Sequence, residues 1–184
     1  MKNIITIAAI VLFLLVGCQN IQNGTLDTSK LTLIEMNDVT DAQKEKMPVT
    51  YQAPSVKEGL SALPFEMKLP AHLPFNAQAF QPPTITDMSH DGKLLMVDFK
   101  TSSKSNSGEA NILMITAINS KVESDLTSSK VVKLSSGVMA YSTNKSLSFY
   151  LDGISYSITY INDDIPQEQH KNEIIDIANQ MIEQ

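Results

Sequence analysis

A chain of 184 residues with 14 lysines, no arginine and 20 acidic residues has a formal net charge of −6. This length suits one domain, and the excess of negative charge disfavours nucleic acid as a partner, because binding to phosphates depends on lysine and arginine. Cys18 is the only cysteine, which excludes an internal disulfide bond.

Residues 1–17 have the pattern of a signal peptide. Lys2 gives a positive start, and residues 4–16 are apolar except for Thr6. A run this short does not cross a hydrocarbon core of about 30 Å, which needs roughly 20 residues. We therefore expect the segment to direct export and then to be removed, rather than to remain as a transmembrane anchor.

The apolar run ends in Leu15-Val16-Gly17-Cys18, which resembles the bacterial lipobox. The resemblance implies cleavage between Gly17 and Cys18 and attachment of a diacylglyceryl group, with acyl chains such as palmitate, to the Cys18 thiol. Two acyl chains hold a protein stably on a membrane, whereas one chain holds it only marginally. The expected location is the extracytoplasmic face of the cell membrane. The alternatives are an ordinary secretory signal and a buried free thiol.

Residues 18–52 are mainly polar, and we expect them to form the lipidated N-terminus and a flexible tether. A flexible coil of ~30 residues spans roughly 30 Å on average. Within this region, residues 31–36 (LTLIEM) are apolar enough to form a short strand or a docking segment.

A short helix is predicted after the tether, because Ser55 and Glu58 have the spacing of a capping box. Pro64 ends this helix, since the residue before a proline disfavours the helical conformation. The proline-rich stretch that follows favours an extended, irregular path along the domain. The apolar side chains that this path should bury are Phe65, Leu69, Leu73 and Phe75.

From Thr84 onward the apolar residues alternate with period two, which indicates β-strands. The expected strands are residues 84–88, 94–101, 111–119, 130–134 and 138–142, followed by a two-stranded hairpin at 146–161. Asp152-Gly153 is a strong signal for a type I′ turn in that hairpin. In that register one face carries Leu147, Phe149, Leu151, Ile154, Tyr156 and Ile158, and the other carries serines.

The C-terminal residues predict an amphipathic helix, with Asp164 in position to cap it. Its apolar stripe consists of Ile174, Ile175, Ile177, Ala178, Met181 and Ile182. The fold class that follows is α+β: a curved antiparallel β-sheet of about six to seven strands, with the C-terminal helix packed on one face and a short N-terminal helix. Residues 53–184 would form this single domain.

Several stretches resemble an uncharacterised extracytoplasmic domain of Bacillus-type bacteria, and the resemblance covers about residues 52–184. They are PSVKEGLSALPFEMKLPAHLPF near the start, and VKLSSGVMAY, LSFYLDGISYSITY and IIDIANQMI near the end. The family has a tryptophan where this chain has Phe149. It occurs on lipoproteins and on the outer parts of envelope-stress and sporulation regulators. The family brings no catalytic residues to carry over to this chain.

Candidate catalytic and metal-binding residues lack the partners that they would need. Ser142 and Lys145 have the S-x-x-K spacing, but they lie between two expected strands rather than at the start of a helix. His72, His90 and His170 have no second histidine or cysteine at metal spacing, so surface positions are favoured for all three. We expect no catalytic site, no metal and no cofactor.

Methionines are frequent in this chain, which has no tryptophan. Methionine suits an adaptable apolar groove, and it also fills ordinary cores. Met96 and Met114 lie within expected strands, so core positions are favoured for these two.

The predicted function is that of a membrane-anchored extracytoplasmic lipoprotein that acts as a binding or accessory protein of the cell envelope. Its partners would be the membrane, through the N-terminal diacylglyceryl lipid, and an envelope protein or an apolar ligand. The candidate binding face consists of Phe149, Tyr156, Ile158 and Tyr160, unless the final helix fills it. One alternative is a cell-envelope hydrolase, which needs paired carboxylates or a nucleophile with a base. The other is a structural or inhibitory lipoprotein with an exposed apolar patch.

Overall fold

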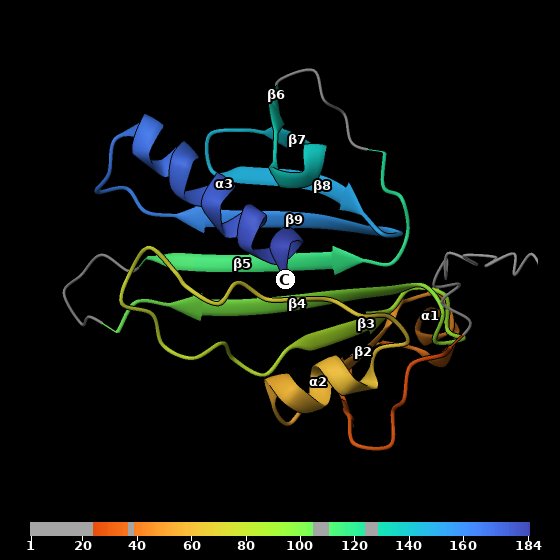
Figure 1. The fold of residues 1–184 in the computed structure, drawn as a ribbon. Helices are drawn as coiled ribbons and strands as arrows, with labels where there is room; N and C mark the ends of the chain where they lie inside the picture. Colours follow the sequence, from red (N-terminus) through yellow and green to blue (C-terminus); the bar gives the residue numbers. More distant parts are fainter. Residues whose placement is uncertain (1–23, 37–38, 105–110, 124–128) are drawn as a thin grey trace, which may run out of the picture.

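A computed structural model of the protein describes residues 24–36, 39–104, 111–123 and 129–184. The predictions for residues 1–17, for cleavage between Gly17 and Cys18 and for lipidation of Cys18 lie outside these residues. The described chain forms an open antiparallel sheet with helices packed against it (Figure 1). The sheet and the C-terminal helix confirm the coarse architecture expected from the sequence.

The sheet has nine strands in the described residues, in the spatial order β1-β2-β3-β4-β5-β9-β8-β7-β6. In chain order the strands are β1 Thr32–Leu33, β2 Val49–Gln52, β3 Thr84–Asp87, β4 Leu95–Ser102, β5 Ile112–Ile118, β6 Lys130–Lys133, β7 Met139–Ser142, β8 Ser146–Leu151 and β9 Ile154–Ile161. All neighbouring pairs are antiparallel, and β5 pairs with β9 rather than with β6.

The expected number of six to seven strands is wrong, because β1 and β2 add to the sheet from within the range predicted as a tether. β2 pairs with β3, and Tyr51 lies opposite Ile85. The Tyr51 side chain packs against the buried core, which gives this short strand an apolar anchor. A short helix, α1 Asp41–Lys44, connects β1 to β2 in the same region.

One face of the sheet carries the core. Along β4 and β9 buried residues alternate with half-buried or exposed ones, and Val97, Phe99 and Ile158 have no exposed surface. Helix α3 Gln167–Glu183 crosses this face in front of β8 and β9 (Figure 1). Its predicted apolar stripe is confirmed, since Ile174 and Ile177 are fully buried. We call this side of the sheet the covered face.

The start of α3 differs from the prediction. Pro166 occupies the N-cap position with an extended backbone, and the helix has no side-chain cap. The backbone N–H of Asp164 instead donates to Asn162 Oδ1 at 3.1 Å, in a turn before the helix. Asp164 is therefore two residues too early to cap it, because Pro166 sets the backbone at the entry.

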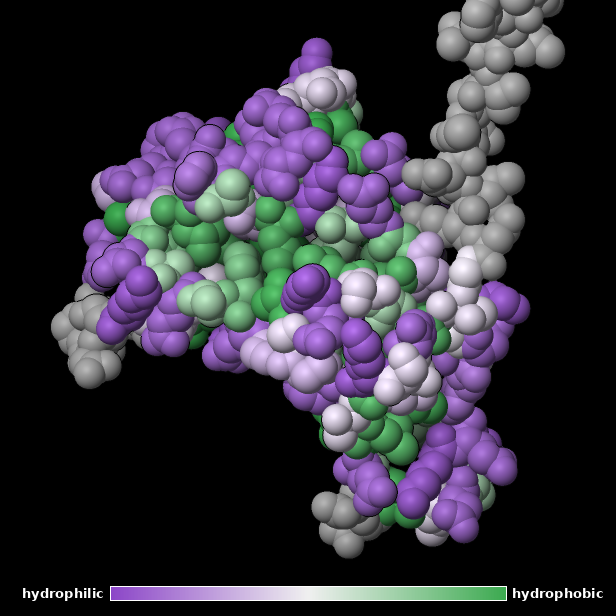
Figure 2. All heavy atoms as spheres, turned by 60° about the horizontal axis from the view of Figure 1, so that its bottom comes forward, coloured by the Kyte–Doolittle hydropathy of each residue, from purple (hydrophilic) through white to green (hydrophobic). Residues whose placement is uncertain are grey.

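The segment between β2 and β3 covers the rest of this face. Helix α2 Val56–Ala62 begins as predicted, with the backbone N–H of Glu58 donating to Ser55 Oγ at 3.2 Å. Phe65 is buried as expected, and Phe75 is half-buried and stacks on Tyr160 with ring centroids 5.7 Å apart. Figure 2 shows hydrophobic residues gathered across the middle of one side of the molecule, between hydrophilic margins.

The hairpin of β8 and β9 has the predicted turn and register. Asp152 and Gly153 have φ angles of 49° and 87°, the positive values that a type I′ turn requires. The turn fixes Phe149 opposite Tyr156. Because side chains alternate along a strand, this register also decides which residues of both strands point away from the core.

Candidate binding site on the open face of the sheet

The face opposite the core, which we call the open face, carries a row of polar side chains. The strand register aligns Asp98, Thr116, Ser157, Ser148 and Tyr141 across β4, β5, β9, β8 and β7. The Thr116 hydroxyl donates to Asp98 Oδ1 at 2.6 Å, and the Ser148 hydroxyl donates to Ser157 Oγ at 3.4 Å. The row joins the consecutive strands β4 and β5 to the consecutive strands β7, β8 and β9, and it contains two hydrogen-bonded pairs.

The neighbouring row is more apolar. It aligns Met96, Ile118, Ser155 and Tyr150. Tyr150, next to the turn between β8 and β9, is 45% exposed. Side-chain alternation places it on the side opposite its neighbour Phe149, which is 4% exposed.

The loop after β5, residues 119–123, folds back over the open face. The backbone N–H of Val122 donates to Ser155 Oγ at 2.9 Å, and the same hydroxyl donates to Ser120 O at 2.7 Å. Ser155 is therefore a structural residue, because its hydroxyl uses both contacts to hold the loop. The loop forms one wall of a depression in the sheet.

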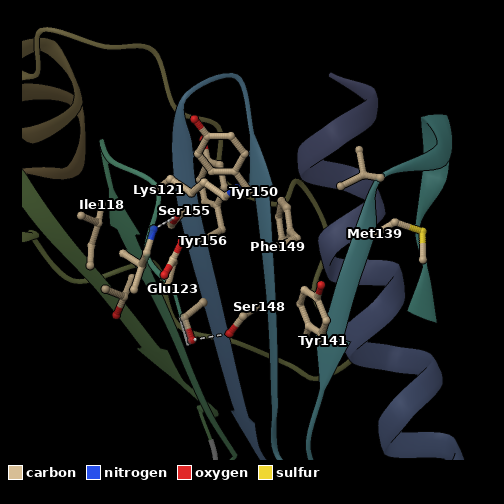
Figure 3. Close-up of a pocket in the computed structure, with 14 residues that line it drawn as sticks. Ile118, Lys121, Glu123, Met139, Tyr141, Ser148, Phe149, Tyr150, Ser155 and Tyr156 are labelled. Carbon is tan, nitrogen blue, oxygen red and sulfur yellow. Dashed lines mark hydrogen bonds between the residues drawn. The ribbon is translucent and has the colours of Figure 1, made fainter. Parts of the chain in front are cut away.

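This depression is a pocket with a volume of about 650 Å³, which lies within the usual range for ligand sites of about 300–1,000 Å³. Its floor includes Ser148 and Ser157, and its walls include Tyr141, Tyr150 and Met139 (Figure 3). The pocket therefore combines hydroxyl groups with exposed aromatic and apolar surface. We call it the open-face pocket.

The charged groups of the open-face pocket are few. Among its described lining residues, Lys121 is the only cation and Glu123 the only carboxylate, and both come from the loop after β5. Burial raises the pKa of Tyr156 to about 12, so its phenol is neutral at physiological pH and does not serve as a base. No group of three histidine, cysteine, aspartate or glutamate residues in the described chain could hold a metal ion. The arrangement suits non-covalent binding.

The predicted binding face lies on the covered side. Ile158 and Tyr160 have no exposed surface, and the Tyr160 ring stacks on Phe75 and on His170, with the centroids of the Tyr160 and His170 rings 4.9 Å apart. Phe149 and Tyr156 stack on each other at 5.0 Å and also border the open-face pocket. The structure thus brings the four predicted residues to one face and fills most of that face with α3 and Phe75.

The other candidate residues are separate from the open-face pocket. Ser142 ends β7, and Lys145 forms an ion pair with Asp163 at 2.7 Å, so the serine and the lysine do not form a catalytic pair. His72 and His90 are exposed, as expected. The surface position expected for His170 is wrong: it is 5% exposed and its Nε2 lies 2.7 Å from Tyr160 O, because Tyr160 offers a ring to stack on and a carbonyl to bind.

The site residues that the sequence did not predict lie on the open face. Met114 is 39% exposed there and Met96 is half-buried, so the core positions expected for both are wrong. The serines of β8 and β9 predicted this face, and alternation with Ser148 places Tyr150 on it, but Tyr141 joins it only through the pairing of β7 with β8. The strand order that brings these residues together becomes visible only in the folded chain.

Comparison with known proteins finds no relative of this chain. The chain matches no family model, no curated protein and no solved structure. Within the part of the chain that the structure describes, no helix has the length and apolar character to cross a membrane.

Proposed function

We propose that this protein is a lipid-anchored lipoprotein on the extracytoplasmic face of the cell membrane, and that its domain binds an envelope protein or an apolar ligand in the open-face pocket. The pocket carries the binding part of this proposal, since it joins exposed Tyr150 and Met139 to a floor of hydroxyl groups. Tyrosine offers rigid, amphipathic contact area, and such residues are enriched where proteins recognise partners.

The anchoring part of the proposal depends on the sequence around Cys18. A positive start, an apolar run and Leu15-Val16-Gly17-Cys18 together resemble a lipoprotein signal. We also propose that the sheet is curved and that the domain is related to the extracytoplasmic family that the sequence resembles. The nearly uncharged lining of the pocket supports a binding role over hydrolysis, because a hydrolase needs converging acid and base groups.

The anchor is tested by replacing Cys18 with alanine in cells that are fed a radioactive or clickable fatty acid. We expect the parent protein to carry the label and to sediment with membranes, and Cys18→Ala to lose both properties. Unchanged membrane retention together with unchanged acyl labelling of the variant would contradict the anchor.

Binding is tested in intact cells with a photo-reactive phenylalanine at Tyr150, and at Glu168 as a matched control. Both positions are exposed, but Tyr150 lies at the pocket and Glu168 lies on α3, across the sheet. We expect a discrete adduct from position 150 and none from position 168. The same adducts from both positions, or none from either, would argue against a site on the open face.

A further inference from the structure

Exposed apolar side chains gather at one end of the open face, where β3 turns into β4 and β5 runs into its loop. Met88 and Leu94 flank the turn and are 44% and 37% exposed, and Val122 in the loop is 46% exposed. Ile118 and Tyr150 continue this surface into the open-face pocket. Exposed apolar residues that are grouped in this way mark a contact surface rather than a chance scatter.

The turn that presents Met88 and Leu94 is tightly held. The backbone N–H of Met88 donates to Leu94 O at 2.8 Å, which fixes the two residues side by side. The buried carboxylate of Asp87 accepts from the N–H groups of Ser89 and Gly92 at 3.1 Å and 2.8 Å. A rigid turn presents its apolar side chains without the entropy loss that ordering a flexible loop would cost.

Asp91 and Lys93 on this turn pair with each other. Asp91 accepts a hydrogen bond from the Ser89 hydroxyl at 2.6 Å and forms an ion pair with Lys93 at 3.0 Å. A turn with paired charges and flanking apolar residues suits a lipid headgroup region better than a strongly acidic surface would.

The N-terminal end of the described chain is fastened to the same turn. The backbone N–H of Leu26 donates to Gly92 O at 2.9 Å. Gly92 has a φ of 71°, and a Cβ atom there would lie 3.0 Å from the Leu26 nitrogen, so this close approach requires glycine. The chain therefore arrives at the end of the sheet that carries this turn, where Gly24 also lies close to Pro64.

The distance from this point to a lipid on Cys18 is short. Gly24 is six residues after Cys18, and six extended residues span at most about 20 Å. The tether of about 30 residues expected from the sequence would have left the orientation of the domain open. Because Gly24 is only six residues from Cys18 and Leu26 is bonded to the turn, a lipid on Cys18 would lie near the end of the sheet that carries this turn.

We propose that the turn from Met88 to Leu94 and the loop residue Val122 contact the lipid headgroup region, so that the open-face pocket opens beside the membrane. This inference rests on the proposed lipidation of Cys18. The partner is the bilayer itself, and the contact adds an apolar, orienting attachment to that of the acyl chains. Binding at such an interface follows the apolar area that enters it, so it should persist at high salt.

The test uses the full-length lipidated protein in vesicles of zwitterionic phosphatidylcholine. Acylation blocks the only native thiol, so an introduced cysteine is a unique site for a fluorophore. The test variants are Met88→Cys and Leu94→Cys, and the control is Met114→Cys. Met114 is 39% exposed on the same face, beside Lys100, which is six residues and about 20 Å along β4 from Leu94.

We expect a quencher on the lipid, placed near the headgroups, to remove about half of the fluorescence at positions 88 and 94, since interfacial side chains lie about 5–10 Å deep. The label at position 114 should keep its fluorescence. Equal quenching at 88, 94 and 114, or none at 88 and 94, would overturn the inference. Shielding of positions 88 and 94 in native membranes but not in protein-free vesicles would also overturn it, in favour of a protein partner.

The same material separates this inference from the proposed function. If the parent chain, without an introduced cysteine, reacts with the thiol fluorophore, Cys18 is free and the lipoprotein proposal fails. If the parent chain is unreactive and membrane-bound while positions 88 and 94 remain unquenched, the anchor stands and the orienting contact fails.

Discussion

The two faces of the sheet are made by the same strands and have opposite characters. β9 shows the contrast in eight residues. Its covered side carries Ile154, Tyr156, Ile158 and Tyr160, and its open side carries Ser155, Ser157, Thr159 and Ile161. The covered side is filled by α3 and by the segment between β2 and β3. Stability is therefore concentrated on one face, and the other is left available for contacts with other molecules.

The largest expected difference in stability is between substitutions at Phe149 and Tyr150, which are adjacent in β8 and lie on opposite faces of the sheet. Phe149→Ala should lower the free energy of unfolding by about 3–5 kcal/mol, because it removes a buried ring that stacks on Tyr156. Tyr150→Ala should change it by only about 0.5 kcal/mol, because this residue is 45% exposed and lies outside the core. Urea denaturation followed by circular dichroism measures both values. Similar losses of unfolding free energy for the two variants would contradict the assignment of Phe149 to the core and of Tyr150 to the open face.

The turn between β8 and β9 sets which residues belong to which face. Gly153→Ala should lower the free energy of unfolding by about 1–2 kcal/mol, since an alanine at a φ of 87° is strained. No atom lies within 4 Å of a Cβ built at Gly153, so the loss would come from the backbone alone. Asp152→Gly is the matched control and should be nearly neutral, because glycine adopts a φ of 49° freely. A neutral Gly153→Ala would contradict the type I′ turn.

The buried tyrosines of the covered face should make the protein less stable at alkaline pH. Burial raises the pKa of Tyr156 and of Tyr160 to about 12, from an ordinary value of 10.0. Above pH 10 the unfolded chain loses these phenolic protons while the folded chain keeps them, so the free energy of unfolding should fall as the pH rises from 10 toward 12. Below pH 10 both states are protonated and the contribution is complete.

The variant Tyr156→Phe tests this slope because it keeps the ring and removes the titrating hydroxyl. Urea midpoints measured at several values between pH 9 and pH 11.5 should fall less steeply for the variant than for the parent, by about half if Tyr160 contributes equally. Tyr160→Phe is the second arm of the experiment. Identical slopes in the parent and in both variants would show that these phenols are not the groups that are buried on folding.

Local signals predicted the covered face well. The alternation from Thr84 onward, the Asp152-Gly153 turn and the stripe of α3 each act over a few residues, so the sequence shows them directly. β2 escaped prediction because it is short and depends on β3, which is more than 30 residues away. β1 lies within residues 31–36, for which a short strand was one of the two expectations. His170 escaped because its burial depends on a ring supplied by β9.

The open-face pocket could not be predicted, because it depends on the order of the strands. β5 pairs with β9, across the whole stretch that forms β6, β7 and β8. Alternation within one strand says which residues share a face, but it does not name the neighbouring strand. The row from Asp98 to Tyr141 therefore has no counterpart in any local pattern of the sequence.

The smallest expected effect on stability belongs to the hydroxyl floor of the open-face pocket. Ser157 accepts one weak hydrogen bond, at 3.4 Å from Ser148, so Ser157→Ala should change the free energy of unfolding by about 0.5 kcal/mol or less. If the floor contacts a ligand, the same change should weaken capture at position 150, by about fivefold for one lost hydrogen bond of about 1 kcal/mol. Thr159→Ala, on the same strand and face but outside the pocket lining, is the control. Equal capture by both variants would mean that the hydroxyl floor shapes the sheet without contacting the ligand, and would leave binding to the apolar walls.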